Sequence, residues 1–244
     1  MELLSTGIAA GLGTAVGLGL LAGGCAYAAK WPGSRIFGET LIAPRSPDEL
    51  ALTFDDGPNA AWTPRLLDVL AEHKVRATFF LLGCHAEAEP ELVRRIAGAG
   101  HLIGNHSWSH PNLALCGKKR IREELSGTSD LLEQIAGVRV KFFRPPFGAR
   151  RPAVLRIARD LGMVPVMWNA MTADWEEPRA NRIDERLIEK IERVTLAGSA
   201  ANIVLHDGGH RESCANREPS VTAAGLLCAR YRASHRFVTM DAWV

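Results

Sequence analysis

Two adjacent carboxylates, Asp55 and Asp56, stand where a short apolar run ends in Gly57-Pro58. Neighbouring anions repel each other, so the pair needs a functional or a structural reason. Asp-Gly-Pro is ordinary turn chemistry, in which the first aspartate caps the next segment. Taken alone, the pair leaves both interpretations open.

His106 and His110 are four residues apart, so on one turn of a helix both rings would point the same way and share a metal. His206 and His210 have the same spacing, but the Asp-Gly-Gly between them disfavours a helical turn. Either pair alone would more often be incidental. Together with Asp56, the first pair makes a ligand set for a divalent cation such as zinc, with positions left open for water and substrate.

Three further polar motifs follow predicted strands. Residues 144–148 read Arg-Pro-Pro-Phe-Gly, and the prolines stiffen a loop that directs Arg144 and a set of backbone amides to one place. A rigid turn with a surface arginine is the alternative. The two later motifs, which add a carboxylate, an aromatic wall and a titratable ring, are Asp174-Trp175 and Leu205-His206-Asp207.

The elements that must position these residues alternate between two types. From residue 50 onward, apolar runs rich in β-branched or aromatic residues alternate with six stretches of helical period, a pattern typical of parallel βα units. Every motif falls just after a predicted strand, where α/β barrels and open parallel sheets build their sites. The seven predicted strands are residues 50–54, 77–82, 101–104, 141–143, 163–168, 202–205 and 236–240.

The clearest predicted helix covers residues 118–136, where apolar side chains fall on one face and charged ones on the other. Pro90 and Pro152 stand where a first helical turn would begin, because that turn does not need their missing N–H. The chain of 244 residues, 47% of them hydrophobic, is large enough for one catalytic domain.

The composition limits the classes of ligand and partner that the chain is expected to bind. The formal charge is only +2, from 29 basic and 27 acidic residues that are spread along the chain, so nucleic-acid binding is not expected. Five cysteines show no CxxC spacing, which argues against a zinc knuckle or a redox dithiol; Cys214 and Cys228 could form a disulfide or remain buried thiols. The oligomeric state is left open.

Residues 3–29 carry no charge and are long enough to cross a membrane as one helix, so we expect a membrane anchor over residues 1–29. A cleaved signal peptide is the alternative, because residues 26–28 resemble a small-x-small cleavage site although a basic start is missing. Residues 30–47 then form a linker, and residues 48–244 form the catalytic domain. The basic residues Lys30 and Arg35 would favour the cytoplasmic side for this domain, whereas the chemistry favours the outside.

The five motifs, in this order and spacing, resemble those of the polysaccharide deacetylases, also called the NodB-homology domain or carbohydrate esterase family 4. The resemblance covers residues 48–240, and five ordered motifs make chance agreement improbable. It implies an irregular (β/α)7 barrel and a hydrolase that removes N-acetyl groups from N-acetylglucosamine units of chitin-like chains or peptidoglycan. The motifs that carry it are Thr53-Phe54-Asp55-Asp56-Gly57, His106-Ser107 with His110, Arg144-Pro145-Pro146-Phe147-Gly148, Asp174-Trp175 and Leu205-His206-Asp207.

The resemblance also implies a role for each residue. Asp56, His106 and His110 would hold the metal, most often Zn²⁺, with Co²⁺ as a substitute. Asp55 would be the general base on the attacking water, oriented by Arg144, and His206 the general acid, oriented by Asp174. The backbone N–H of Phe147 would stabilise the oxyanion, and Leu205 and Trp175 would line the pocket for the acetyl methyl group.

A polysaccharide substrate implies that the domain lies outside the cytoplasm, either in the periplasm or in the extracellular space. If the N-terminal segment is cleaved, the protein would be secreted.

Two positions depart from the family pattern: Phe147 stands where tyrosine is frequent, and Met171 stands where many members carry a further aspartate. Two other hypotheses stay open. The same fold could act on O-acetyl esters or a small amide, or the chain could be a membrane-tethered glycan-binding protein without turnover, which Met171 makes conceivable.

Overall fold

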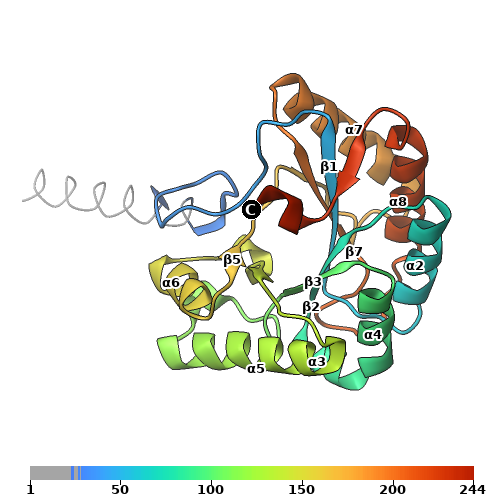
Figure 1. The fold of residues 1–244 in the computed structure, drawn as a ribbon. Helices are drawn as coiled ribbons and strands as arrows, with labels where there is room; N and C mark the ends of the chain where they lie inside the picture. Colours follow the sequence, from blue (N-terminus) through green and yellow to red (C-terminus); the bar gives the residue numbers. More distant parts are fainter. Residues whose placement is uncertain (1–22, 25–26, 28) are drawn as a thin grey trace, which may run out of the picture.

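The structure is a computed structural model that describes residues 23, 24, 27 and 29–244 (Figure 1). Most of the predicted anchor over residues 3–29 therefore lies outside the described residues. Within the part that is described, no helix has the length and apolar character needed to cross a membrane.

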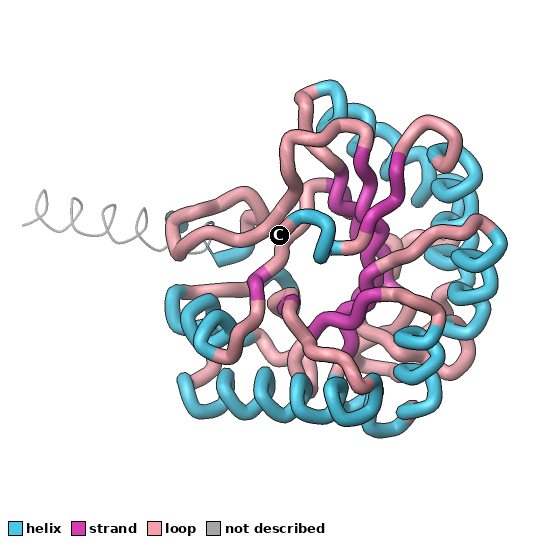
Figure 2. Tube along the Cα trace, viewed as in Figure 1, coloured by secondary structure: helices cyan, strands magenta, loops and turns pink. Residues whose placement is uncertain are grey.

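A curved parallel sheet lies at the centre of the molecule, and the helices pack around its outer side (Figures 1 and 2). The strands follow the order β5-β4-β3-β2-β1-β7-β6, and β8 pairs with β1. All of the strand pairs are parallel, as the alternation of strand and helix predicted. The strands are β1 Glu49–Asp55, β2 Thr78–Leu81, β3 Leu102–Asn105, β4 Phe142–Phe143, β5 Val164–Pro165, β6 Ala170–Met171, β7 Ala201–His206 and β8 Arg236–Val238.

The helices supply the outer layer of the predicted irregular barrel. They are α2 Thr63–Glu72, α3 Gly83–Ala88, α4 Pro90–Gly98, α5 Lys118–Ala136, α6 Pro152–Asp160, α7 Ala180–Leu196 and α8 Glu218–Tyr231, with short 3₁₀ turns η1 Leu113–Leu115, η2 Pro146–Gly148 and η3 Met240–Trp243. Helix α5 has the predicted bounds and ends at Gly137, whose φ of +68° suits glycine. Pro90 and Pro152 begin α4 and α6, as predicted.

The core lies between the sheet and the helices. Every residue of β1 is buried, because the strand is central and both of its faces are covered. Helix α7 turns Ile183, Leu187 and Ile191 inward, which is the spacing of one helical face.

The strand predicted over residues 163–168 is shorter in the structure. Strand β5 ends at Pro165, and the next residue, Val166, donates its N–H to the carbonyl of Phe143 and forms an isolated bridge with Leu41. The chain then forms β6, an unpredicted strand of two residues that pairs with β7. Two residues are too few for alternation to be visible in a sequence.

Residues 30–48 run along the domain and are fastened to it by a buried arginine. The backbone N–H of Arg150 donates to the carbonyl of Ala29. Its guanidinium donates to the carbonyls of Trp31 at 2.7 Å, Ser34 at 3.0 Å and Gly148 at 3.1 Å. The division into segments 1–29, 30–47 and 48–244 stays a prediction.

Candidate metal and catalytic site

The sequence motifs meet at one edge of the sheet, because the strands are parallel and their carboxyl ends lie together. Asp55 ends β1 and His206 ends β7, and the strand register makes these two residues direct neighbours. Arg144 follows β4, and His106 follows the end of β3. Residues up to 151 positions apart in sequence are thereby brought to one place.

His106 and His110 converge, but the helical turn invoked to explain their spacing is wrong. They lie in an irregular loop in which Ser107 and His110 have positive φ angles of 71° and 54°. Two contacts hold the loop: Asn105 accepts the Ser107 N–H at 2.7 Å, and buried Glu124 of α5 accepts two loop N–H groups at 2.8 Å each. Tertiary contacts therefore place the rings.

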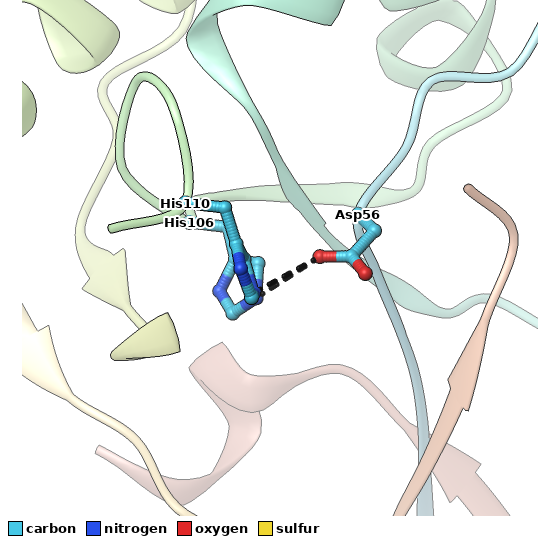
Figure 3. A group of neighbouring side chains, drawn as sticks. All are labelled: Asp56, His106 and His110. Carbon is cyan, nitrogen blue, oxygen red and sulfur yellow. Dashed lines mark ion pairs between the residues drawn. The ribbon is translucent and has the colours of Figure 1, made fainter. Parts of the chain in front are cut away.

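A buried cluster of three ligand atoms has the shape of a metal site. Oδ1 of Asp56 lies 3.4 Å from Nε2 of His106 and 3.3 Å from Nε2 of His110, and Figure 3 shows both rings facing this carboxylate. Oδ1 has no hydrogen-bond partner among the described residues. A tetrahedral zinc ion with bonds of about 2.0–2.1 Å would separate neighbouring ligands by about 3.3 Å. The donor set therefore fits a divalent cation.

The protonation states around the cluster also suit a cation. Nδ1 of His106 lies 2.8 Å from the carbonyl oxygen of Arg144, to which it donates, and this bond turns Nε2 toward Asp56. Burial and the neighbouring His106 lower the pKa of His110 to about 3. Burial opposes ionisation of Asp56, but contacts with His106 and His210 hold its pKa well below the ordinary value. The neutral ring of His110 and the ionised carboxylate of Asp56 thus present their lone pairs to the point that Nε2 of His106 also faces.

Asp55 forms a buried pair with Arg144 beside this cluster. Nη1 of Arg144 donates to Oδ1 of Asp55 at 2.8 Å and to Oγ1 of Thr53 at 2.7 Å, and Nη2 donates to Asn202 at 3.2 Å. The guanidinium also lies 4.1 Å above the centre of the Phe80 ring. These contacts fix the arginine and hence the carboxylate, whose other oxygen is left for a reacting group.

His206 forms a second pair with Asp174 on the other side of the cluster. Nδ1 of His206 lies 2.8 Å from Oδ1 of Asp174, whose second oxygen accepts the His206 backbone N–H and the Ser220 hydroxyl. Burial alone would lower the pKa of His206, but Asp174, with Asp56 and Asp55, raises it to about 9. The imidazolium therefore persists at neutral pH and can donate a proton.

Two glycines allow the loop after β1 and the loop after β7 to pack closely against each other. A Cβ on Gly57 would lie 2.5 Å from Oδ2 of Asp207, and a Cβ on Gly208 would collide with the Asp56 carbonyl. Asp207 accepts the Thr63 hydroxyl at 2.5 Å, and its burial raises its pKa to about 7. This packing ties the β1 and β7 loops together under the metal cluster.

A pocket of about 330 Å³ opens above these residues. Its wall is largely apolar and includes Phe147, Trp175 and Met171. Leu205, which was predicted to line the pocket, is fully buried in the core and is not among the described residues that line it. The other predicted site residues, apart from buried Arg144 and Asp174, all face the pocket.

His210 is the functional candidate that the sequence analysis missed. Its ring stacks on His110 with a centroid distance of 4.4 Å, and its Nδ1 lies 3.7 Å from Oδ2 of Asp56. The signal in the sequence is its four-residue spacing from His206, which does not require a helical turn. The Asp-Gly-Gly loop between the two histidines brings His210 to the site without one.

Comparisons with known proteins agree with this geometry. A family model described as polysaccharide deacetylase matches residues 43–166. A peptidoglycan-N-acetylglucosamine deacetylase of Bacillus cereus is 43% identical over 145 residues, which are 59% of this chain and 53% of that protein. A chitooligosaccharide deacetylase of Sinorhizobium fredii is 35% identical over 170 residues, 69% of this chain and 76% of that protein.

Crystal structures of proteins with a similar fold are known. The crystal structure of a peptidoglycan N-acetylglucosamine deacetylase is 36% identical, has a TM-score of 0.74, and covers 83% of this chain and 91% of its own. The chain spans about half the length of the B. cereus relative. The predicted barrel and the predicted family are both confirmed, and the chain belongs to the polysaccharide deacetylase family.

Proposed function

We propose that the chain is a metal-dependent hydrolase that removes N-acetyl groups from polysaccharides containing N-acetylglucosamine. One observation carries the proposal: two hydrogen-bonded acid–base pairs flank a buried three-ligand cluster at one sheet edge. These groups are Asp55 with Arg144, His206 with Asp174, and the cluster of Asp56, His106 and His110. The names of the relatives, chitooligosaccharide and peptidoglycan deacetylases, support this class of substrate.

The residues divide the reaction between them. A divalent cation on the three ligands, for which we favour zinc with cobalt as a substitute, would polarise the acetyl carbonyl and acidify water. Asp55, oriented by Arg144, accepts a proton as the water oxygen bonds to the acetyl carbon. The C–N bond then breaks, the nitrogen takes a proton from His206, and acetate and a free amine are released.

Residues of the pocket wall would contact the carbonyl oxygen and the methyl group of the acetyl group. We assign the backbone N–H of Phe147 to the oxyanion and Trp175 to the methyl group, as the family resemblance implies, whereas buried Leu205 does not reach the pocket. Phe147 lies in the turn after Arg144 with a φ of +57°, and Trp175 packs edge-on against His206 at 4.9 Å. Both residues line the pocket.

The N-terminal segment is assigned to a membrane. We propose that residues 3–29 anchor the chain, with the catalytic domain outside the cytoplasm, or that they are cleaved as a signal. The support is the uncharged sequence of that length and the extracytoplasmic location of peptidoglycan and chitin-like substrates. External protease should digest the domain in intact cells once any outer membrane is permeabilised; protection there would refute this placement.

Acetate release tests the activity. Zinc-loaded protein should release acetate from chitotetraose or from peptidoglycan, lose this activity after chelation, and regain it with zinc or cobalt. Asp55→Asn should lower kcat by about 10³-fold, whereas Asp68→Asn, an exposed aspartate on α2, should not. Absence of acetate release from either substrate and from acetylated xylan by metal-loaded wild type would disprove the proposal.

A further inference from the structure

A second groove opens beside the catalytic pocket and shares two of its walls. It has a volume of about 430 Å³ and is bounded by Met171 and Trp175, which also line the catalytic pocket. The opposite wall is helix α7. We call it the basic groove, because of the charges that this helix supplies.

Three cations of α7 line the basic groove: Arg186, Lys190 and Arg193. Their spacing of four and three residues places them along one stripe of the helix, beside its buried face. Glu189 is the single carboxylate among the lining residues. Arg186 lies 3.6 Å from Glu177, but Lys190 and Arg193 form no ion pair with any residue that the structure describes. The groove thus has an excess of unpaired positive charge.

A buried hydroxyl lies in the same groove without a partner. Thr172 is 7% exposed, and its Oγ1 makes no hydrogen bond with another described residue. A buried polar atom left unpaired costs free energy, and Thr172 stands beside the cations in the wall of the groove.

The boundary with the catalytic pocket carries no negative charge. Met171 stands there, an uncharged side chain that lines both cavities. An aspartate would repel an anion that extends from one cavity into the other. On the other side of Trp175, by contrast, the adjoining groove is acidic, with Asp174, Glu176 and Glu218 among its lining residues. An anionic substrate in the catalytic pocket would therefore extend into the basic groove and not into the acidic one.

We propose that the basic groove binds carboxylate groups on the sugar unit next to the one that loses its acetyl group. This rests on the proposed deacetylase function and narrows its substrate. A carboxylate-bearing strand of peptidoglycan, with its lactyl ethers and stem peptides, supplies such groups, whereas neutral chitin does not. The favoured substrate is therefore the anionic glycan.

Three oligosaccharides of equal length test the charge requirement: a peptidoglycan tetrasaccharide with free carboxylates, the same compound with its carboxylates amidated, and chitotetraose. With zinc-loaded wild type, kcat/KM should be highest for the free acid, and added salt should reduce this advantage. The double variant Lys190→Gln/Arg193→Gln should raise KM for the free acid about fivefold and leave kcat unchanged. Its kinetics with the two neutral substrates should stay at wild-type values.

Two further variants make the result specific. Arg182→Gln changes a cation of the same helix that is paired with Glu185 and does not line the groove, so it should leave all three substrates unaffected. Met171→Asp should lower kcat/KM for the free acid more than for chitotetraose. Equal effects on all three substrates, or a wild type without preference for the free acid, would refute the groove proposal. Retained turnover of chitotetraose in that case would leave the deacetylase proposal intact.

Discussion

The proposed active site has two regions that differ in burial and in the number of contacts that hold each side chain. In the inner region, Arg144 makes three hydrogen bonds and Asp174 accepts three. In the rim, Phe147 and Trp175 are 50% and 43% exposed. The inner region consists of Asp55, Arg144, Asp174, His206 and the three metal ligands; the rim consists of Phe147, Met171, Trp175 and His210.

This difference indicates how the two regions can change. A side chain fixed by several buried partners cannot be replaced without leaving those partners unsatisfied, so its loss should reduce both turnover and stability. A rim side chain has few such partners, so its replacement should alter binding and leave folding intact. The inner region is therefore suited to a fixed reaction, and the rim to a substrate that varies.

Arg144→Met tests the inner region most severely. The variant leaves Asp55 buried without its partner, so we expect the free energy of unfolding to fall by about 3–5 kcal/mol. Without its orienting cation Asp55 should also lose its role as base, and kcat should fall by about 10³-fold. Denaturant titration and acetate release measure the two losses, with Arg156→Met, at an exposed position of α6, as the control. A variant that loses activity but keeps full stability would contradict the coupling.

Asp174→Asn should have the next largest effect, a fall in kcat of about 10²-fold. His206 donates a proton only while it is protonated, so activity should be lost as the pH rises through its pKa of about 9. Without the carboxylate, burial lowers this pKa, and the alkaline limb of the kcat–pH profile should move toward neutral pH. Ser220→Ala, which removes one bond to Asp174, should move the limb less. An unmoved limb in Asp174→Asn would show that His206 is not the acid.

The inner region could be predicted from the sequence because its residues follow strands. Asp55, Arg144 and His206 each stand at or just after a strand end, and parallel pairing alone brings strand ends together. The strong periodicity of residues 118–136 likewise gave the bounds of α5. Local patterns were sufficient where regular elements determine the geometry.

Loops could not be predicted in the same way. The loop in which Ser107 and His110 adopt left-handed conformations is held by Glu124, which accepts two N–H groups between them and lies 14 residues beyond His110 in the sequence. His210 reaches the cluster because Gly208 packs against the backbone of Asp56, a contact between loops 152 residues apart. Tertiary contacts of this range leave no periodic signal in a sequence.

His210→Ala tests whether a side chain of the rim supports the metal ligands. The ring stacks on His110 and approaches the second oxygen of Asp56, so its loss should loosen both ligands and raise the zinc Kd about tenfold. Because His210 is exposed to solvent on one side, the melting temperature of the metal-free protein should hardly change. Calorimetric zinc titration measures the affinity, and His235→Ala is the control, since His235 is a partly exposed histidine that does not line the pocket. An unchanged Kd would remove His210 from the metal site.

Phe147→Tyr should have the smallest effect, within about twofold on kcat and KM. The assigned contact with the oxyanion is made by the backbone N–H, which the substitution keeps, and half of the side chain is exposed, so the new hydroxyl can be hydrated. Phe147→Gly keeps the same N–H and suits the φ of +57°, but it removes the ring that packs at 4.4 Å against His110. We therefore expect the glycine variant to raise KM by a few fold and the tyrosine variant to leave it unchanged. A tenfold loss of kcat in Phe147→Tyr would show instead that the ring itself, and not the backbone, takes part in the reaction.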